Sequence, residues 1–122
     1  MKKALLILSL FFIGISSSYA WTQVGMSAYG FDQNWDGIEV TTSYSVNINS
    51  TCDVLIFRGN LGSQNLDSYF AFDAYDYANN FSYNIFMTYG QGFYQGFTDL
   101  YFGTLNMYLT TYHAYVTAVL EY

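Results

Sequence analysis

Residues 38–48 alternate between two kinds of side chain without a break. One parity holds Ile38, Val40, Thr42, Tyr44, Val46 and Ile48, and the other holds Glu39, Thr41, Ser43, Ser45 and Asn47. A period of two in β-branched and aromatic residues is typical of a strand that buries one face. This segment therefore predicts a core built from β-sheet.

The chain beyond this strand continues in short apolar segments separated by Gly, Asn and Ser. We predict further strands at 53–58, 67–78, 81–89 and 93–102, turns at 49–51 and 78–80, and a loop at 59–65. Residues 105–122 fit a helix as well as a strand, but their Tyr and Thr content favours a strand, which would have to bend or change sheets. The pattern predicts an all-β fold, a small antiparallel β-sandwich or barrel, with one domain over 21–122.

Residues 1–20 have the three parts of a secretory signal peptide. Lys2 and Lys3 precede an apolar run, and small residues at Ser18 and Ala20 provide a cleavage site. The apolar run is too short to cross a bilayer as a helix, and no later stretch is a candidate transmembrane helix. We therefore expect a secreted, extracellular protein, or one in the periplasm or at the cell surface.

The charge of the chain limits the partners that it can bind. Two of the three basic residues lie in the signal peptide, so Arg58 stands alone against nine acids in the rest of the chain. Binding to nucleic acid requires several Lys or Arg side chains to neutralise phosphates, and binding to an anionic membrane surface requires a basic patch. The sequence argues against both partners.

Side chains suited to catalysis are sparse. Cys52 is the single cysteine and His113 is the single histidine, and they lie far apart in the sequence. Ser-His-Asp and Cys-His catalysis both depend on that histidine. We expect a protein that is not an enzyme, with a satisfied or surface His113. We expect Cys52 to be a buried thiol or to form a bridge to another chain.

Residues 32–39, Asp-Gln-Asn-Trp-Asp-Gly-Ile-Glu, form the most specific local motif. Oxygen side chains at alternate positions before a glycine match the first half of a calcium loop. The ligands of such an ion would be Asp32, Asn34, Asp36 and Glu39. However, Ser43 stands where the loop needs a bidentate glutamate. A polar turn that leads into the strand accounts for the same residues, so the turn and the calcium site both remain open.

Three functions fit these observations, and the first is a structural or adhesive surface protein. Pro is absent and Lys is confined to the first three residues, so the residues that usually guard strand edges are missing. Strands that combine high β-propensity with little charge pair readily through their edges. The chain is therefore expected to self-assemble through strand edges and exposed aromatic rings.

The second function is a carbohydrate-binding β-sandwich module, assisted by calcium if the loop holds the ion. Exposed aromatic rings pack on the apolar faces of sugars, while amides and carboxylates bond to sugar hydroxyls. The candidate rings are Trp21, Trp35, Tyr94 and Tyr101. The third function is a small outer-membrane β-barrel, which the alternating strands and the terminal Tyr122 suggest.

Overall fold

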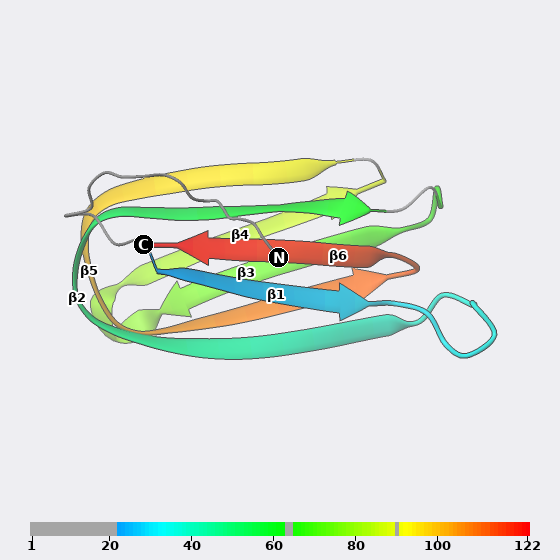
Figure 1. Ribbon diagram of the computed structural model, residues 1–122, viewed down its shortest axis with the longest axis horizontal. Helices are drawn as coiled ribbons and strands as arrows, with labels where there is room; N and C mark the ends of the chain where they lie inside the picture. Colours follow the sequence, from blue (N-terminus) through cyan, green and yellow to red (C-terminus); the bar gives the residue numbers. More distant parts are fainter. Residues whose placement is uncertain (1–21, 63–64, 90) are drawn as a thin grey trace, which may run out of the picture.

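The computed structural model describes residues 22–62, 65–89 and 91–122, and these residues form an antiparallel β-sandwich (Figure 1). The predicted all-β class is confirmed. The elements are β1 (Gln23–Tyr29), β2 (Glu39–Gly62), β3 (Tyr69–Asp76), the short 3₁₀ turn η1 (Tyr77–Asn79), β4 (Phe81–Thr88), β5 (Gly92–Tyr112) and β6 (Tyr115–Glu121). Within these ranges no helix has the length and apolar character needed to span a membrane. The predicted signal peptide and Trp21 lie outside the described residues.

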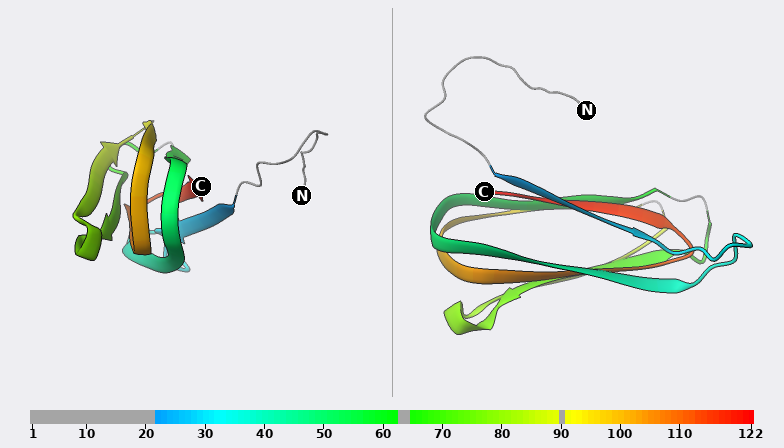
Figure 2. Two further views of the ribbon diagram at one scale, coloured as in Figure 1. Left: turned by 90° about the vertical axis from the view of Figure 1, so that its left-hand side faces the viewer. Right: turned by 60° about the horizontal axis from the view of Figure 1, so that its bottom comes forward.

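Two long strands, β2 and β5, run through both layers of the sandwich. They pair with each other from Glu39 opposite Tyr112 to Asn60 opposite Gly92, and both fold over together (Figures 1 and 2). What we call the first layer has the order β1, β6, second half of β2, first half of β5. The second layer has the order first half of β2, second half of β5, β3, β4. The layers are therefore two ends of one folded sheet.

The fold-over occurs at a β-bulge in β2, where the pairing register shifts between Asn47 and Ser50. Asn49 takes a left-handed conformation there, with φ of 51°. The prediction of a turn at 49–51 between two separate strands is wrong, because the bulge bends the strand without ending it. The buried carboxylate of Asp76, at the end of β3, stabilises the bend. Its Oδ2 accepts hydrogen bonds from the backbone N–H of Gly103 and from the side-chain amide of Asn79, both at 2.8 Å.

Three other predicted boundaries differ from the structure. Residues 59–62 extend β2 and are not part of a loop, because they pair with β6. The strand predicted at 93–102 does not end there but continues through residue 112 as β5. The strand interpretation of 105–122 is correct, but the segment is divided between β5 and β6 by a tight turn at His113, whose φ is 55°.

Aromatic rings from both layers fill the core. Phe57 has no exposed surface and lies 5.4 Å from Phe72, 5.5 Å from Tyr83 and 6.1 Å from Phe97 between ring centroids. Cys52 also belongs to this core, where burial, followed by the nearby charge of Asp53, raises the pKa of its thiol above the usual value. A thiol held in its neutral form is a poor nucleophile.

Candidate functional site

The outer face of the first layer brings together side chains that lie far apart in the sequence. The pairing register places Tyr94, Arg58, Val119 and Gly25 side by side across four strands. In the next row Asn60 lies beside Thr117, and in the row after that Tyr115 lies beside Tyr29. Because alternate residues of a strand point to the same side, these rows form one continuous surface, which we call the first outer face.

A shallow hollow of about 340 Å³ lies on this face. It is lined by Arg58, Gly59, Asn60, Phe93, Tyr94, Thr117 and Val119. Tyr94 stands at its margin with 69% of its surface exposed, and Phe93 closes the floor from the core side. The hollow therefore offers an aromatic ring, an apolar surface and polar groups within one site, which is the usual composition of a small-molecule site.

The charged groups of the hollow are already paired. Arg58 Nε donates to Glu121 Oε1 at 2.9 Å, with side-chain exposures of 41% and 24%. Gln23 Nε2 donates to the other carboxylate oxygen of Glu121 at 3.3 Å. This network orients the Arg58 guanidinium, which carries five N–H donors, and leaves it partly exposed at the hollow. The arrangement presents both donors and acceptors to a neutral ligand.

Two glycines leave the sheet bare next to the polar groups. Gly25 lies beside Val119 and Gly96 lies beside Ile56, both on the first outer face. Among the described residues, a Cβ added at Gly25 would meet no atom within 4 Å, and one at Gly96 would make only ordinary contacts. Packing does not require a glycine at either position. Their effect is to let another molecule approach the backbone closely.

A cluster of aromatic rings closes the other end of the first outer face. Trp35 is 70% exposed, and its ring lies 6.2 Å from Tyr29 and 6.0 Å from Phe31. Tyr29 also lies 6.1 Å from Tyr115. The backbone of Trp35 is left-handed, with φ of 65°, which is a strained conformation for a bulky residue. The loop holds a large ring in solvent at a conformational cost, and such strain is a frequent mark of a functional position.

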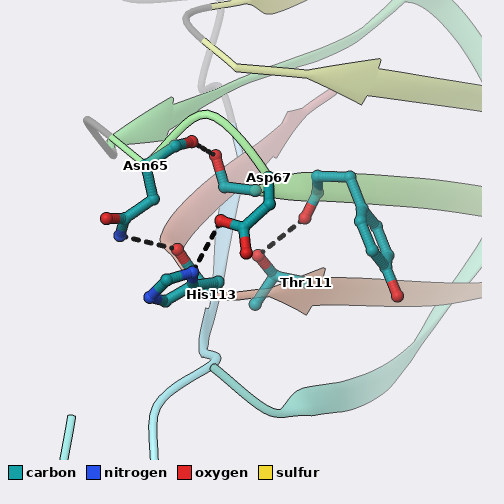
Figure 3. Close-up of polar contacts among 6 residues, drawn as sticks. Asn65, Asp67, Thr111 and His113 are labelled. Atoms are coloured by element: carbon teal, nitrogen blue, oxygen red, sulfur yellow. Dashed lines mark hydrogen bonds and ion pairs between the residues drawn. The ribbon is translucent and has the colours of Figure 1, made fainter. Parts of the chain in front are cut away.

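His113 supports this aromatic cluster from below. Its Nδ1 lies 2.7 Å from Asp67 Oδ1, and its carbonyl accepts the side-chain amide of Asn65 at 3.2 Å (Figure 3). Its ring packs against Phe31 at 5.4 Å and lies where a Cβ on Gly37 would stand. The expectation of a satisfied histidine agrees with these contacts. His113 thus joins the 65–68 segment, the β5–β6 turn and the Trp35 loop.

The His113–Asp67 pair also has the geometry of half a nucleophile-activating triad. Cys52 does not complete it, because its side chain is buried in the core. Ser68 is buried as well, and its hydroxyl donates to the Asn65 carbonyl at 2.6 Å. In the described part of the chain we find a structural role for each of these groups.

The structure places the predicted binding rings in two regions. Trp35 and Tyr94 lie on the first outer face, at its two ends. Tyr101 is exposed but lies seven residues further along β5 than Tyr94, about 23 Å away along the strand, near the fold-over. The sequence did not single out Arg58, Asn60 or Tyr115 for this site, since only the pairing register brings them beside Tyr94.

The predicted calcium ligands do not gather at one point. Asp32 Oδ1 accepts the backbone N–H groups of Asn34 at 2.8 Å and Asp36 at 2.9 Å, which stabilises the turn. Glu39 lies on β2 and accepts the hydroxyl of Tyr69 on the second layer. Among the residues described there is no group of three or more His, Cys, Asp or Glu suited to a metal ion. Calcium binding stays a prediction, which a calcium titration of Trp35 fluorescence would test.

Comparison with known proteins yields little. No protein-family model matches the sequence, and no curated protein matches it either. Among solved structures, the chain is similar to the carbohydrate-binding module TmCBM61, determined in complex with β-1,4-galactotriose. The identity is 9%, the TM-score is 0.45, and the match covers 84% of this chain and 87% of the module. A likeness at this level says nothing about the function of this chain.

Proposed function

We propose that the protein is a non-enzymatic, secreted module that binds a neutral oligosaccharide on its first outer face. The observation that carries the proposal is the hollow lined by Tyr94, where an exposed ring, an apolar surface and oriented polar groups meet. A sugar has apolar C–H faces and a rim of hydroxyls. Such a ligand fits a surface that combines aromatic rings with hydrogen-bonding side chains.

The charge of the face favours a neutral sugar. Arg58 is paired with Glu121, so the site has no surplus positive charge to attract a sulfate or a uronic acid. The nine acids of the chain would repel a polyanion. The expected polar contacts are hydrogen bonds from the Arg58, Asn60 and Gln23 side chains to sugar hydroxyls.

The dimensions of the face favour an oligosaccharide over a single sugar. Val119, next to the hollow, and Tyr115, in the aromatic cluster, lie four residues apart on β6, which corresponds to about 13 Å. One sugar ring cannot contact both ends of the face. A chain of sugars would pack on Tyr94 at one end and on the ring of Trp35 at the other.

The test is isothermal titration calorimetry of the purified protein with neutral cello-, xylo-, manno-, galacto- and chito-oligosaccharides, and with heparin as the charged counterpart. We expect a neutral oligosaccharide to bind, with affinity that rises with length. Tyr94→Ala should weaken binding at least about tenfold, which equals about 1.4 kcal/mol. Tyr101→Ala, which removes another exposed ring from the same strand, should leave the affinity unchanged. Binding of heparin alone, or equal losses in both variants, would contradict the proposal.

The alternative function is self-association, as expected for a structural or adhesive protein. A specific feature of the second layer, the open edge of β4, favours it. This feature is independent of the sugar site.

A further inference from the structure

The two sides of the sandwich, where the edges of the two layers meet, are closed to different degrees. On one side β1 lies against the first half of β2, and Thr42 Oγ1 donates to the Ser27 carbonyl at 3.0 Å. On the other side β4 ends the second layer, and of the described strands only β3 pairs with it. Gln91 bonds both the backbone N–H and the carbonyl of Thr88, so the outer edge of β4 remains available for a further strand over residues 81–87.

The core is also incompletely covered beneath β4. Its inward side chains Tyr83, Ile85 and Met87 pack against the core but are only partly buried. On the outer side, Phe86 is 62% exposed although its ring stacks on Tyr69 at 5.6 Å. A strand added to this edge would cover apolar surface in addition to forming backbone hydrogen bonds.

The charge distribution selects β4 among the edges of the sandwich. Phe81–Thr88 contains no charged residue. In contrast, the exposed first half of β5 carries Asp99, and the first half of β2 begins with Glu39. β1 is also uncharged, but β2 lies against it. Two acids of β3 lie opposite β4: Asp73 accepts a hydrogen bond from Asn84 at 2.7 Å, and Asp76 is buried. Because the chain is strongly acidic, two copies repel each other least at β4.

The sequence of β4 is also complementary to itself. When two copies are placed antiparallel about a two-fold axis at Asn84, Tyr83 of one copy lies opposite Ile85 of the other, and Phe81 lies opposite Met87. The outer side then pairs Ser82 with Phe86. Apolar side chains meet apolar side chains on the core side, and no charges meet anywhere along the strand.

From these observations we propose that a second copy of this chain pairs with β4, strand to antiparallel strand, so that the second layers of two molecules join into one continuous sheet. The site is the outer edge of residues 81–87, and the partner is the same strand of another molecule. The face that we assign to sugar lies on the other layer and remains accessible in this dimer.

The experiment is sedimentation velocity across a series of protein concentrations, using protein produced from the full chain. Wild type should sediment as a dimer at high concentration and dissociate on dilution. Asn84→Glu places two like charges at or beside the two-fold axis, where Asp73 adds a further negative charge, and should weaken the dimer at least about tenfold. Ser43→Glu makes the same charge change on the exposed side of β2 at the other edge of the layer, and it should leave the dimer intact.

The outcomes separate this proposal from the sugar proposal. A wild type that stays monomeric at every concentration would overturn it, as would equal dissociation of both variants, which would indicate another interface. If thermal melting shows that Asn84→Glu does not fold, Ser82→Glu serves in its place. Tyr94→Ala should dimerise like wild type, so that loss of sugar binding and loss of the dimer can be told apart.

Discussion

On the outer face of the second layer the tyrosine rings stack on one another, whereas on the first outer face Tyr94 has no ring partner among the described residues. Tyr75 stacks on Tyr108 at 5.7 Å and on Tyr77 at 4.4 Å. Tyr69 stacks on Tyr112 at 5.3 Å. The rings of the second layer therefore contact each other, and Tyr94 faces solvent.

Polar side chains pair across strands on both faces. On the second layer Thr41 pairs with Thr110 at 2.8 Å and Ser45 with Asn106 at 2.7 Å. On the first layer Arg58 pairs with Glu121 at 2.9 Å, but here the polar groups lie around a hollow beside an exposed ring. A face whose groups satisfy one another contributes to stability, while a face with exposed rings and donors is suited to binding. Composition alone does not distinguish the two.

The largest expected effect is on the binding side of this comparison. Trp35→Gly removes the exposed ring and places glycine at a left-handed position that it adopts freely. We expect the sugar affinity to fall at least about tenfold, while the free energy of unfolding stays the same or rises by up to about 1 kcal/mol. Calorimetry and urea denaturation measure the two quantities. Tyr77→Ala, which removes an equally exposed ring from the second layer, should not change the affinity; a matching loss there would erase the distinction between the faces.

A smaller effect is expected on the stability side. In a double-mutant cycle with Tyr75→Ala and Tyr108→Ala, the coupling free energy should be about 0.5–1.5 kcal/mol, because the rings stack and Tyr75 donates its hydroxyl to Tyr108 at 3.1 Å. Sugar affinity should be unchanged in all three variants. Additive losses of stability would show that the stacked rings do not support each other.

The smallest effect concerns alkaline pH. The hydrogen bond to Glu39, followed by burial and nearby charge, raises the pKa of the Tyr69 phenol. The hydrogen bond with Tyr108, followed by burial and the neighbouring phenols, raises the pKa of the Tyr75 phenol. A phenol whose pKa is raised in the folded state contributes stability that is complete below its unfolded value of about 10 and is lost as the pH rises through the folded value. Stability should therefore fall from about pH 10 upward, and Tyr75→Phe should reduce the slope. Equal slopes in wild type and variant would refute this role for Tyr75.

The strand pattern could be predicted from the sequence wherever alternation was strong. Residues 39–48 of the alternating segment lie in β2, and 81–88 form β4. Val46 of the predicted inner face is buried and Glu39 of the outer face is exposed, but Tyr44 of the inner face is 48% exposed. The continuity of β2 could not be predicted, because Asn49 and its neighbours have the composition of a turn. A bulge with one left-handed asparagine uses the same residue types as a turn, and only pairing with β5 decides between them.

The candidate site was predictable only in part. Trp35 and Tyr94 could be proposed as binding rings because they are aromatic and flanked by Gly, Asn and Gln. Their place on one face depends on the register of β6 between β1 and β2, which no local pattern specifies. The sequence shows that Arg58 is the single Lys or Arg residue outside the predicted signal peptide. Its position beside Tyr94, however, follows from the β2–β5 pairing alone.

The shared strands β2 and β5 have a consequence for how the chain reaches its native state. Both layers are ends of one ribbon, so neither layer has a complete set of strands without the other. Asn60 and Gly92 are the paired ribbon residues nearest in sequence, and even their pairing closes a loop that contains β3 and β4. Such distant pairings make folding slow but cooperative. A nascent chain cannot secure either half before β5 has left the ribosome.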